Sequence, residues 1–172
     1  RLRLPPLRER LEDIGVSGVE AHLPAGATPR EAAGWIANLV RSCQLPVIVK
    51  VAAINAAPQA EACTAAGADV LVVATPPGGA AAAPEGSLVE GSVAGPAAFP
   101  FTLHALLAVT ELGLGLPLIA AGGITLAQDV AECWQHGATA VQLRSILWTA
   151  PDAVAGLMAD AQRTMPSANA RA

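Results

Sequence analysis

The chain has 172 residues, is 53% apolar and 14% charged, and carries a formal net charge of −4. This length suits one domain, and the apolar content excludes a disordered chain. The negative charge argues against binding of nucleic acid, and no apolar run reaches the roughly 18 residues of a membrane-spanning helix. Cys43, Cys63 and Cys133 form no CxxC pair and no metal-ligand spacing, so we expect buried thiols in a cytoplasmic protein without a metal site.

Short apolar runs typical of strands alternate with longer segments of helical periodicity. We expect strands at 16–22, 45–51, 70–74, 116–121 and 140–143, and helices at 29–43, 57–66, 101–112, 125–136 and 151–164. Capping boxes mark two helix starts, Thr28 with Glu31 and Thr125 with Gln128. Residues 7–13 predict a further helix, residues 75–100 a long loop, and the residues from 165 a frayed tail.

One pattern recurs where a helix passes into a strand. The segments GADV at 67–70 and GATAV at 137–141 follow helices, and GVSGV at 15–19 is a weaker copy. Glycine there supplies the left-handed C-cap, and the apolar residues after it enter the sheet. The recurrence is typical of tandem strand–helix units with apolar strands covered on both faces. A doubly wound sheet or a barrel satisfies this pattern.

The order of elements favours an α/β fold of the (β/α)8 TIM-barrel type. A closed barrel has eight strands, and only five are visible. We therefore interpret residues 1–172 as a single partial TIM-barrel domain that holds about strands 4–8 with their helices. The other strands are missing from this sequence, are supplied by another chain, or are replaced by a second copy. A part-barrel left alone would expose strand edges.

The strand expected at 116–121 runs into Gly122 and Gly123 and then into a helix start. Glycines let the backbone approach an oxyanion, and a helix start offers free N–H groups. In (β/α) barrels a phosphate site lies after strands seven and eight, so its second half is expected at Arg144 and Ser145. A glycine pair alone also predicts a simple tight turn; its place in the strand order favours the phosphate site.

Lys50 and His22 end two neighbouring strands. Alternation places Lys50 on the same face as Ile48, at the mouth of a barrel. There Lys50 could contact a cofactor ring or a substrate anion, or form a Schiff base, and His22 could donate a proton. A lysine reaching solvent and a polar strand-end histidine are the simpler alternatives. The loop at 75–100 could close over the mouth as a lid.

Together these segments resemble the dihydroorotate dehydrogenase family of FMN-dependent barrels. The resemblance rests on PVIVK at 46–50, GAD at 67–69, AGPA at 94–97, AGGI at 121–124 with Asp129, and the segment 137–142. It implies FMN as cofactor, with Lys50 beside the flavin ring, where an ammonium suits negative charge. The cofactor-binding residues that the resemblance implies are Lys50, Thr75, Gly95, Gly122, Gly123, Arg144 and Ser145.

The resemblance weakens where the family binds its substrate. In place of an Asn-x-x-Cys/Ser-Pro-Asn stretch, residues 22–27 read HLPAGA, which puts Ala25 at the position of the catalytic base. Alanine cannot take a proton. An Asn-Thr pair is replaced by Ala74-Thr75, and a Gly-Thr pair by Arg144-Ser145. The residues that bind the cofactor in the family are thus partly retained, and those that bind the substrate are largely lost.

We therefore expect an FMN-binding, dihydroorotate dehydrogenase-like oxidoreductase of the pyrimidine-biosynthesis type, impaired by Ala25, with Lys50 and His22 as catalytic residues and a small molecule as substrate. One alternative is an inactive barrel subunit that a partner chain or a second copy completes. Another is a barrel with a phosphate ligand but no flavin, for example an isomerase or lyase that uses Lys50.

Overall fold

The computed structural model describes residues 11, 15–24 and 26–164. Ala25, the tail from 165 and most of the helix expected at 7–13 lie outside these residues. The described strands are β1 (Val19–His22), β2 (Val47–Ala52), β3 (Val70–Thr75), β4 (Gly78–Ala82), β5 (Leu88–Ser92), β6 (Leu118–Ala121) and β7 (Ala140–Gln142). The described helices are α2 (Pro29–Ser42), α3 (Ala56–Ala65), α4 (Phe99–Thr110), α5 (Ala127–Gln135), α6 (Ile146–Thr149) and α7 (Ala153–Thr164), with 3-10 turns at Ala53–Asn55 and Pro96–Ala98.

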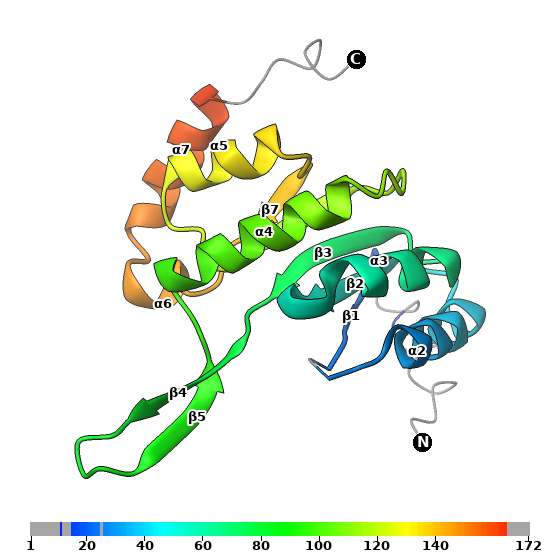
Figure 1. Cartoon of the computed structure of the whole chain (residues 1–172). Coiled ribbons are helices and arrows are strands. Elements are labelled where there is room, and N and C mark those ends of the chain that lie inside the picture. The colour runs from blue at the N-terminus through cyan, green and yellow to red at the C-terminus, as the bar shows by residue number, and fades with distance from the viewer. Residues whose placement is uncertain (1–10, 12–14, 25, 165–172) are drawn as a thin grey trace.

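Five strands form one parallel sheet in the order β1-β2-β3-β6-β7, which is also their order along the chain. A doubly wound sheet reverses its order at a switch point, so the unbroken order excludes that alternative. Helices α2 to α5 connect successive strands and pack along the sheet (Figure 1). The α/β fold of a partial TIM barrel is therefore confirmed.

The two faces of the sheet differ in burial. Val47, Val49 and Val51 of β2 are at most 1% exposed because the helices cover them. Ile48 and Lys50 point to the other face and are only partly buried, as the alternation along this strand predicts. In β6, Leu118 and Ala120 are buried and Ile119 between them is partly buried, whereas residues 71–74 of β3 are buried on both faces. The helix-covered face is the core, and the opposite face is the inside of the part-barrel.

Local signals in the sequence explain most element boundaries. Thr28 and Glu31 form the expected capping box of α2, with Glu31 N donating to Thr28 Oγ1 and Thr28 N to Glu31 Oε2. The second expected box is wrong in one partner. Asp129, not Gln128, accepts the backbone N–H of Thr125 and of Leu126, so the shorter acidic side chain caps α5.

The helix expected at 151–164 is present as α7, which begins two residues later, at Ala153. A further short helix that was not expected, α6, occupies residues 146–149. Pro151 lies between them, where its missing N–H and fixed φ separate the two helices. The first strand begins at Val19 rather than at residue 16.

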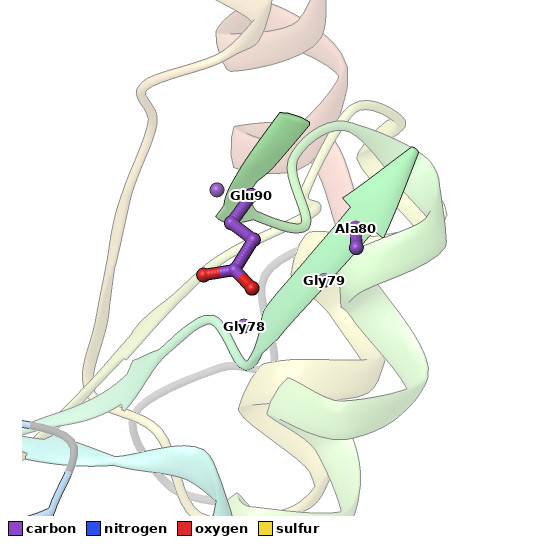
Figure 2. Close-up of a pocket in the computed structure, with 5 residues that line it drawn as sticks. Gly78, Gly79, Ala80 and Glu90 are labelled. Atoms are coloured by element: carbon purple, nitrogen blue, oxygen red, sulfur yellow. The ribbon is translucent and has the colours of Figure 1, made fainter. Parts of the chain in front are cut away.

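The segment expected as a loop at 75–100 contains an antiparallel hairpin. Strands β4 and β5 pair from Gly78 with Ser92 to Ala82 with Leu88, and the hairpin projects away from the barrel wall (Figure 1). Every residue of both strands is exposed. An open hollow of about 540 Å³ runs along it, lined by Gly78, Gly79, Ala80, Glu90 and Gly91 (Figure 2). These residues are separate from the polar cluster at the barrel mouth described below.

The three cysteines are free and buried, as expected. Desolvation raises the pKa of Cys63 to about 11 and, with help from Asp129 and Glu132, that of Cys133 to about 12. The described helices are too short or too polar to cross a membrane.

Candidate functional site

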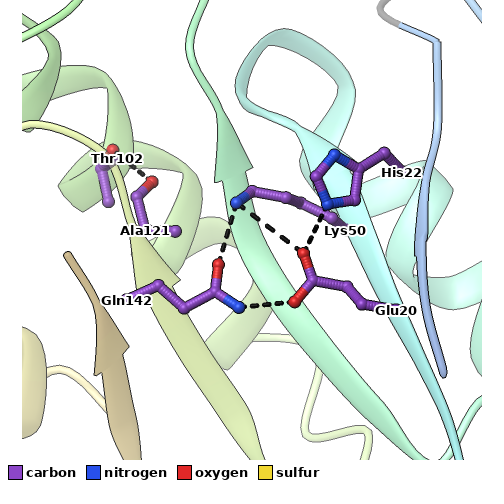
Figure 3. A network of polar contacts seen from close by, with 6 residues as sticks. All are labelled: Glu20, His22, Lys50, Thr102, Ala121 and Gln142. Atoms are coloured by element: carbon purple, nitrogen blue, oxygen red, sulfur yellow. Dashed lines mark hydrogen bonds and ion pairs between the residues drawn. The ribbon is translucent and has the colours of Figure 1, made fainter. Parts of the chain in front are cut away.

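A polar cluster lies on the inside of the part-barrel, where three strands contribute side chains (Figure 3). Lys50 Nζ on β2 donates to Gln142 Oε1 on β7 at 2.9 Å. Gln142 Nε2 donates to Glu20 Oε2 on β1 at 2.5 Å. Glu20 Oε1 lies 2.6 Å from His22 Nε2 and 3.9 Å from Lys50 Nζ. The cluster therefore joins both predicted catalytic residues through a carboxylate and an amide.

Lys50 is the only lysine in the chain; the other nine cationic side chains are arginines. Its side chain is 14% exposed. Burial lowers the pKa of Lys50, the carboxylate of Glu20 raises it, and the charge of Arg144 lowers it further. Because its pKa is lowered, a larger fraction of this amine is unprotonated than of a lysine in solvent. The hydrogen bond to Gln142 fixes the orientation of its side chain.

His22 ends β1 in register with Lys50 of β2. Its side chain is 64% exposed, whereas that of Glu20 is 24% exposed. Glu20 precedes His22 by two positions, so both side chains project to the same face of the strand. This places an imidazole at the edge of the site and a carboxylate beneath it.

The glycine pair after β6 has a packing reason. Gly123 has φ +72°, and a Cβ there would lie 2.2 Å from Phe99 N at the start of α4. A Cβ on Gly122 would lie 2.6 Å from Thr102 Oγ1, which donates instead to Ala121 O (Figure 3). The two glycines therefore let the turn after β6 approach the start of α4, a close contact that no other residue type permits.

The same turn offers hydrogen-bond donors. Among the described residues, no acceptor pairs with the backbone N–H of Gly123 or of Ile124, although both residues are buried. Arg144 and Ser145 follow β7, the neighbouring strand, and the Arg144 side chain is exposed and close enough to Lys50 to act on its charge. Free N–H groups after one strand and a guanidinium after the neighbouring strand are the kinds of group that bind phosphate.

Two predicted cofactor residues are not joined to this cluster. Gly95 has φ +72° and precedes the turn at Pro96–Ala98, and Thr75 is the last residue of β3, with its side chain outside the described part. Within the described part of the chain, no hydrogen bond or ion pair connects Gly95 to Lys50 or His22. Their roles beside a cofactor stay predictions.

A buried glutamine fixes the loops around the mouth. Gln59 on α3 is 0% exposed; its Oε1 accepts from Ala52 N, and its Nε2 donates to Ala27 O. It thereby ties the loop after β1 to the end of β2. The loop after β1 is the one in which the family places its base.

Sequence reasoning missed Glu20 and Gln142 as site residues. Alternation along β1, the pattern that places Lys50 on its face of β2, also puts Glu20 on the same face as His22. For Gln142, alternation gives its face of β7 but not its partner, because Lys50 lies 92 positions away. That contact depends on the curvature of the sheet.

Comparison with solved structures supports the fold. The chain superposes on GMP reductase from Trypanosoma brucei, determined with guanosine 5'-triphosphate, with a TM-score of 0.66 and 24% identity, covering 92% of this chain and 38% of that one. At this identity the likeness shows the barrel fold alone.

Curated relatives confirm the resemblance to the dihydroorotate dehydrogenase family. The catalytic subunits of dihydroorotate dehydrogenase B (NAD(+)) from Geotalea daltonii and Geotalea uraniireducens are 31% and 33% identical to it, each over 165 residues. These alignments cover 86% of this chain and 54% of each relative, so the chain spans about half their length.

A family model also matches residues 34–170, most of the chain, and its description is nitronate monooxygenase. This family is not the one that the sequence motifs resemble. Nitronate monooxygenase and dihydroorotate dehydrogenase are both named for redox reactions. The matched range includes Lys50, both glycines of the turn after β6, Gln142 and Arg144. The chain belongs to the nitronate monooxygenase family.

Proposed function

We propose that this chain binds FMN at the inside mouth of the part-barrel and serves in the flavin-dependent oxidation of a small molecule. The observation that carries the proposal is the only lysine of the chain, held at 14% exposure inside the barrel by Gln142. The family and the curated relatives, all named for redox reactions, support a redox role.

The turn after β6 and the residues after β7 would hold the phosphate of FMN. The backbone N–H groups of Gly123 and Ile124 supply neutral donors, and Arg144 with Ser145 supplies charge and a hydroxyl. Lys50 would then lie beside the ring system, which in flavoenzymes accepts the electrons of the substrate. Its ammonium would favour negative charge there.

We further propose that turnover of dihydroorotate is weak or absent. The resemblance puts the catalytic base at Ala25, and alanine has no group that can take a proton. We therefore propose that the site descends from a dehydrogenase of the pyrimidine-biosynthesis type but now acts on a different substrate. A cytoplasmic location fits the three unpaired thiols.

A second candidate is an inactive subunit, and the open side of the barrel favours it. β1 and β7 are the outer strands of the sheet, and the inward face around Ile48 and Lys50 is only partly buried. The curated relatives are about twice as long and are named catalytic subunits. Three further strands from another chain or a second copy would pair with these edges. Gel filtration with light scattering tests this idea: a soluble monomer that stays monodisperse at high concentration would argue against it.

The potential of bound flavin tests the main proposal. Lys50→Ala should make bound FMN harder to reduce, because a positive charge beside the ring is lost, while FMN affinity changes less. Lys50→Arg keeps the charge and serves as the matched control for midpoint potentials measured by dye equilibration. Equal potentials in wild type and Lys50→Ala would show that Lys50 does not lie beside the ring.

A further inference from the structure

Glu20 is the junction of the polar cluster, and neither the family resemblance nor the residue pattern assigned it a role. Its carboxylate contacts three side chains from three strands: His22 on β1, Lys50 on β2 and Gln142 on β7. Glu20 Oε2 accepts a hydrogen bond from the Gln142 amide. Glu20 Oε1 lies between the His22 imidazole and the Lys50 ammonium.

The contact with Glu20 decides which nitrogen of His22 carries the proton. Nε2 lies 2.6 Å from the carboxylate oxygen, and a carboxylate only accepts hydrogen bonds, so Nε2 holds a hydrogen. In the neutral ring the lone pair is then on Nδ1. The side chain is 64% exposed, so Nδ1 is accessible at the mouth of the site. This is the arrangement of a histidine base that a carboxylate orients.

We propose that His22 and Glu20 form the acid–base pair of this site, with Glu20 as the positioning residue. His22 Nδ1 takes a proton from a carbon or nitrogen acid of the substrate, and the electron pair of the broken bond stays on the substrate. The imidazolium that forms is stabilised by the Glu20 carboxylate and returns its proton to solvent. The pair supplies the proton acceptor that Ala25 lacks. This role depends on the proposed function in one respect: the substrate must bind at the mouth of the part-barrel.

Among the described residues, the charged groups that lie near this pair fit the assignment. Lys50 and Gln142 hold the carboxylate from the far side, and Arg144 acts on Lys50 from the end of β7. Lys50 itself is a poorer proton acceptor because its Nζ already donates to Gln142 and lies near Glu20. The imidazole is the more exposed of the two members of the pair, and its neutral ring has a basic nitrogen, Nδ1, that does not contact Glu20.

The tautomer of His22 tests the pairing without any cofactor or substrate. Long-range ¹H–¹⁵N spectra of the full chain at mildly alkaline pH should show His22, assigned with His22→Asn, as the Nε2–H form. Glu20→Ala should return it to a mixture of both tautomers, and Glu61→Ala, an exposed acid on α3, should leave it unchanged. A mixed or Nδ1–H form in the wild type, or one insensitive to Glu20→Ala, would overturn the pairing.

Chemical rescue tests the catalytic role. In flavin-loaded protein, His22→Ala should lower kcat at least tenfold with little change in KM, and added imidazole should restore much of it, because the site is open to solvent. Glu20→Gln should give an intermediate loss. Rescue that fails while the protein stays folded and flavin-loaded would overturn the proton-transfer role. If flavin does not bind at all, the proposed function fails, whereas the tautomer experiment still decides the His22–Glu20 pair.

Discussion

Glu20 and Gln142 lie on the two outermost strands of a five-stranded sheet, 122 positions apart, yet their side chains share a hydrogen bond. In a flat sheet the outer strands would be separated by four strand spacings of about 4.8 Å each. The bond therefore shows that the sheet curls as a barrel wall does. Lys50, between them on β2, completes the bridge through Gln142.

Removing the amide of the bridge should weaken the fold. We expect Gln142→Ala to lower the free energy of unfolding by about 1–2 kcal/mol, because a charged pair loses its hydrogen-bond partner. Urea unfolding measures this change. Gln162→Ala, exposed on α7, is the control and should change it by less than about 0.5 kcal/mol. Equal effects of the two substitutions would mean that the bridge does not hold the curved sheet.

Because Lys50 is the only lysine of the chain, the rate at which it is acylated reports the protonation state of its amine. The carboxylate of Glu20 raises the pKa of Lys50, so Glu20→Gln should lower that pKa further and increase the fraction of free amine. Acetic anhydride should then modify Lys50 several-fold faster at pH 8, as peptide mass spectrometry would show separately from the N-terminal amine. Glu61→Gln removes an equal charge elsewhere and should leave the rate unchanged; a slower reaction in Glu20→Gln would refute the contact.

The turn after β6 should not tolerate a side chain. Gly123→Ala puts a Cβ 2.2 Å from Phe99 N and needs φ +72°, so a loss of more than about 4 kcal/mol, or no folded protein, is expected. Gly34→Ala is the matched control, since nothing lies within 4 Å of its Cβ on α2. That substitution should stabilise the chain by about 0.5–1 kcal/mol. Thermal unfolding measures both changes. If both variants melted at the temperature of the wild type, the close approach of Gly123 to α4 would be refuted.

Alkaline pH should destabilise the protein through two thiols. Cys63 and Cys133 ionise near 9 when unfolded but only at about 11 and about 12 when folded. Above pH 9 the unfolded chain therefore binds fewer protons than the native one, and stability falls by about 1.4 kcal/mol per unit and thiol. The loss starts near pH 9 and continues to the folded values.

A double variant isolates this effect. Cys63→Ala/Cys133→Ala is less stable at pH 7 because buried volume is lost, but its stability should fall less steeply from pH 9 to 11. The contribution of Lys50, whose lowered pKa acts in the opposite direction, cancels in the difference between the two curves. The chain has no tyrosine to add a further alkaline group. Parallel curves for the two proteins would show that the thiols are not shielded from water.

Local patterns predicted most of the barrel wall. The alternation around Val49 gave both faces of β2, and Gly67 and Gly137 end helices with φ near +97° and +98°. The β4–β5 hairpin escaped prediction because its residues are mostly Ala and Gly and are all exposed, so no apolar alternation marks it. The capping box of α5 was assigned to Gln128 from its spacing to Thr125, whereas the carboxylate of Asp129, one position further on, accepts both N–H groups.

The sequence predicted individual residues of the site but not the contacts that join them. Strand ends placed Lys50 and His22 at one mouth, since parallel strands end on the same side. Their connection through Glu20 and Gln142 depends on how far the sheet curls, and this follows from helix packing along the whole wall rather than from any short segment. The packing role of Gly123 against α4 was equally hidden, because the two segments are 24 positions apart in sequence.

Titration of the purified chain with FMN and with riboflavin tests whether the part-barrel binds FMN through its phosphate. We expect one FMN per chain, a flavin spectrum, and at least about tenfold weaker binding of riboflavin, which lacks the phosphate. Arg144→Ala should reduce that preference, whereas Arg41→Ala, exposed on α2, should keep it. A colourless protein that takes up no FMN, or one that binds both flavins equally, would contradict this mode of binding.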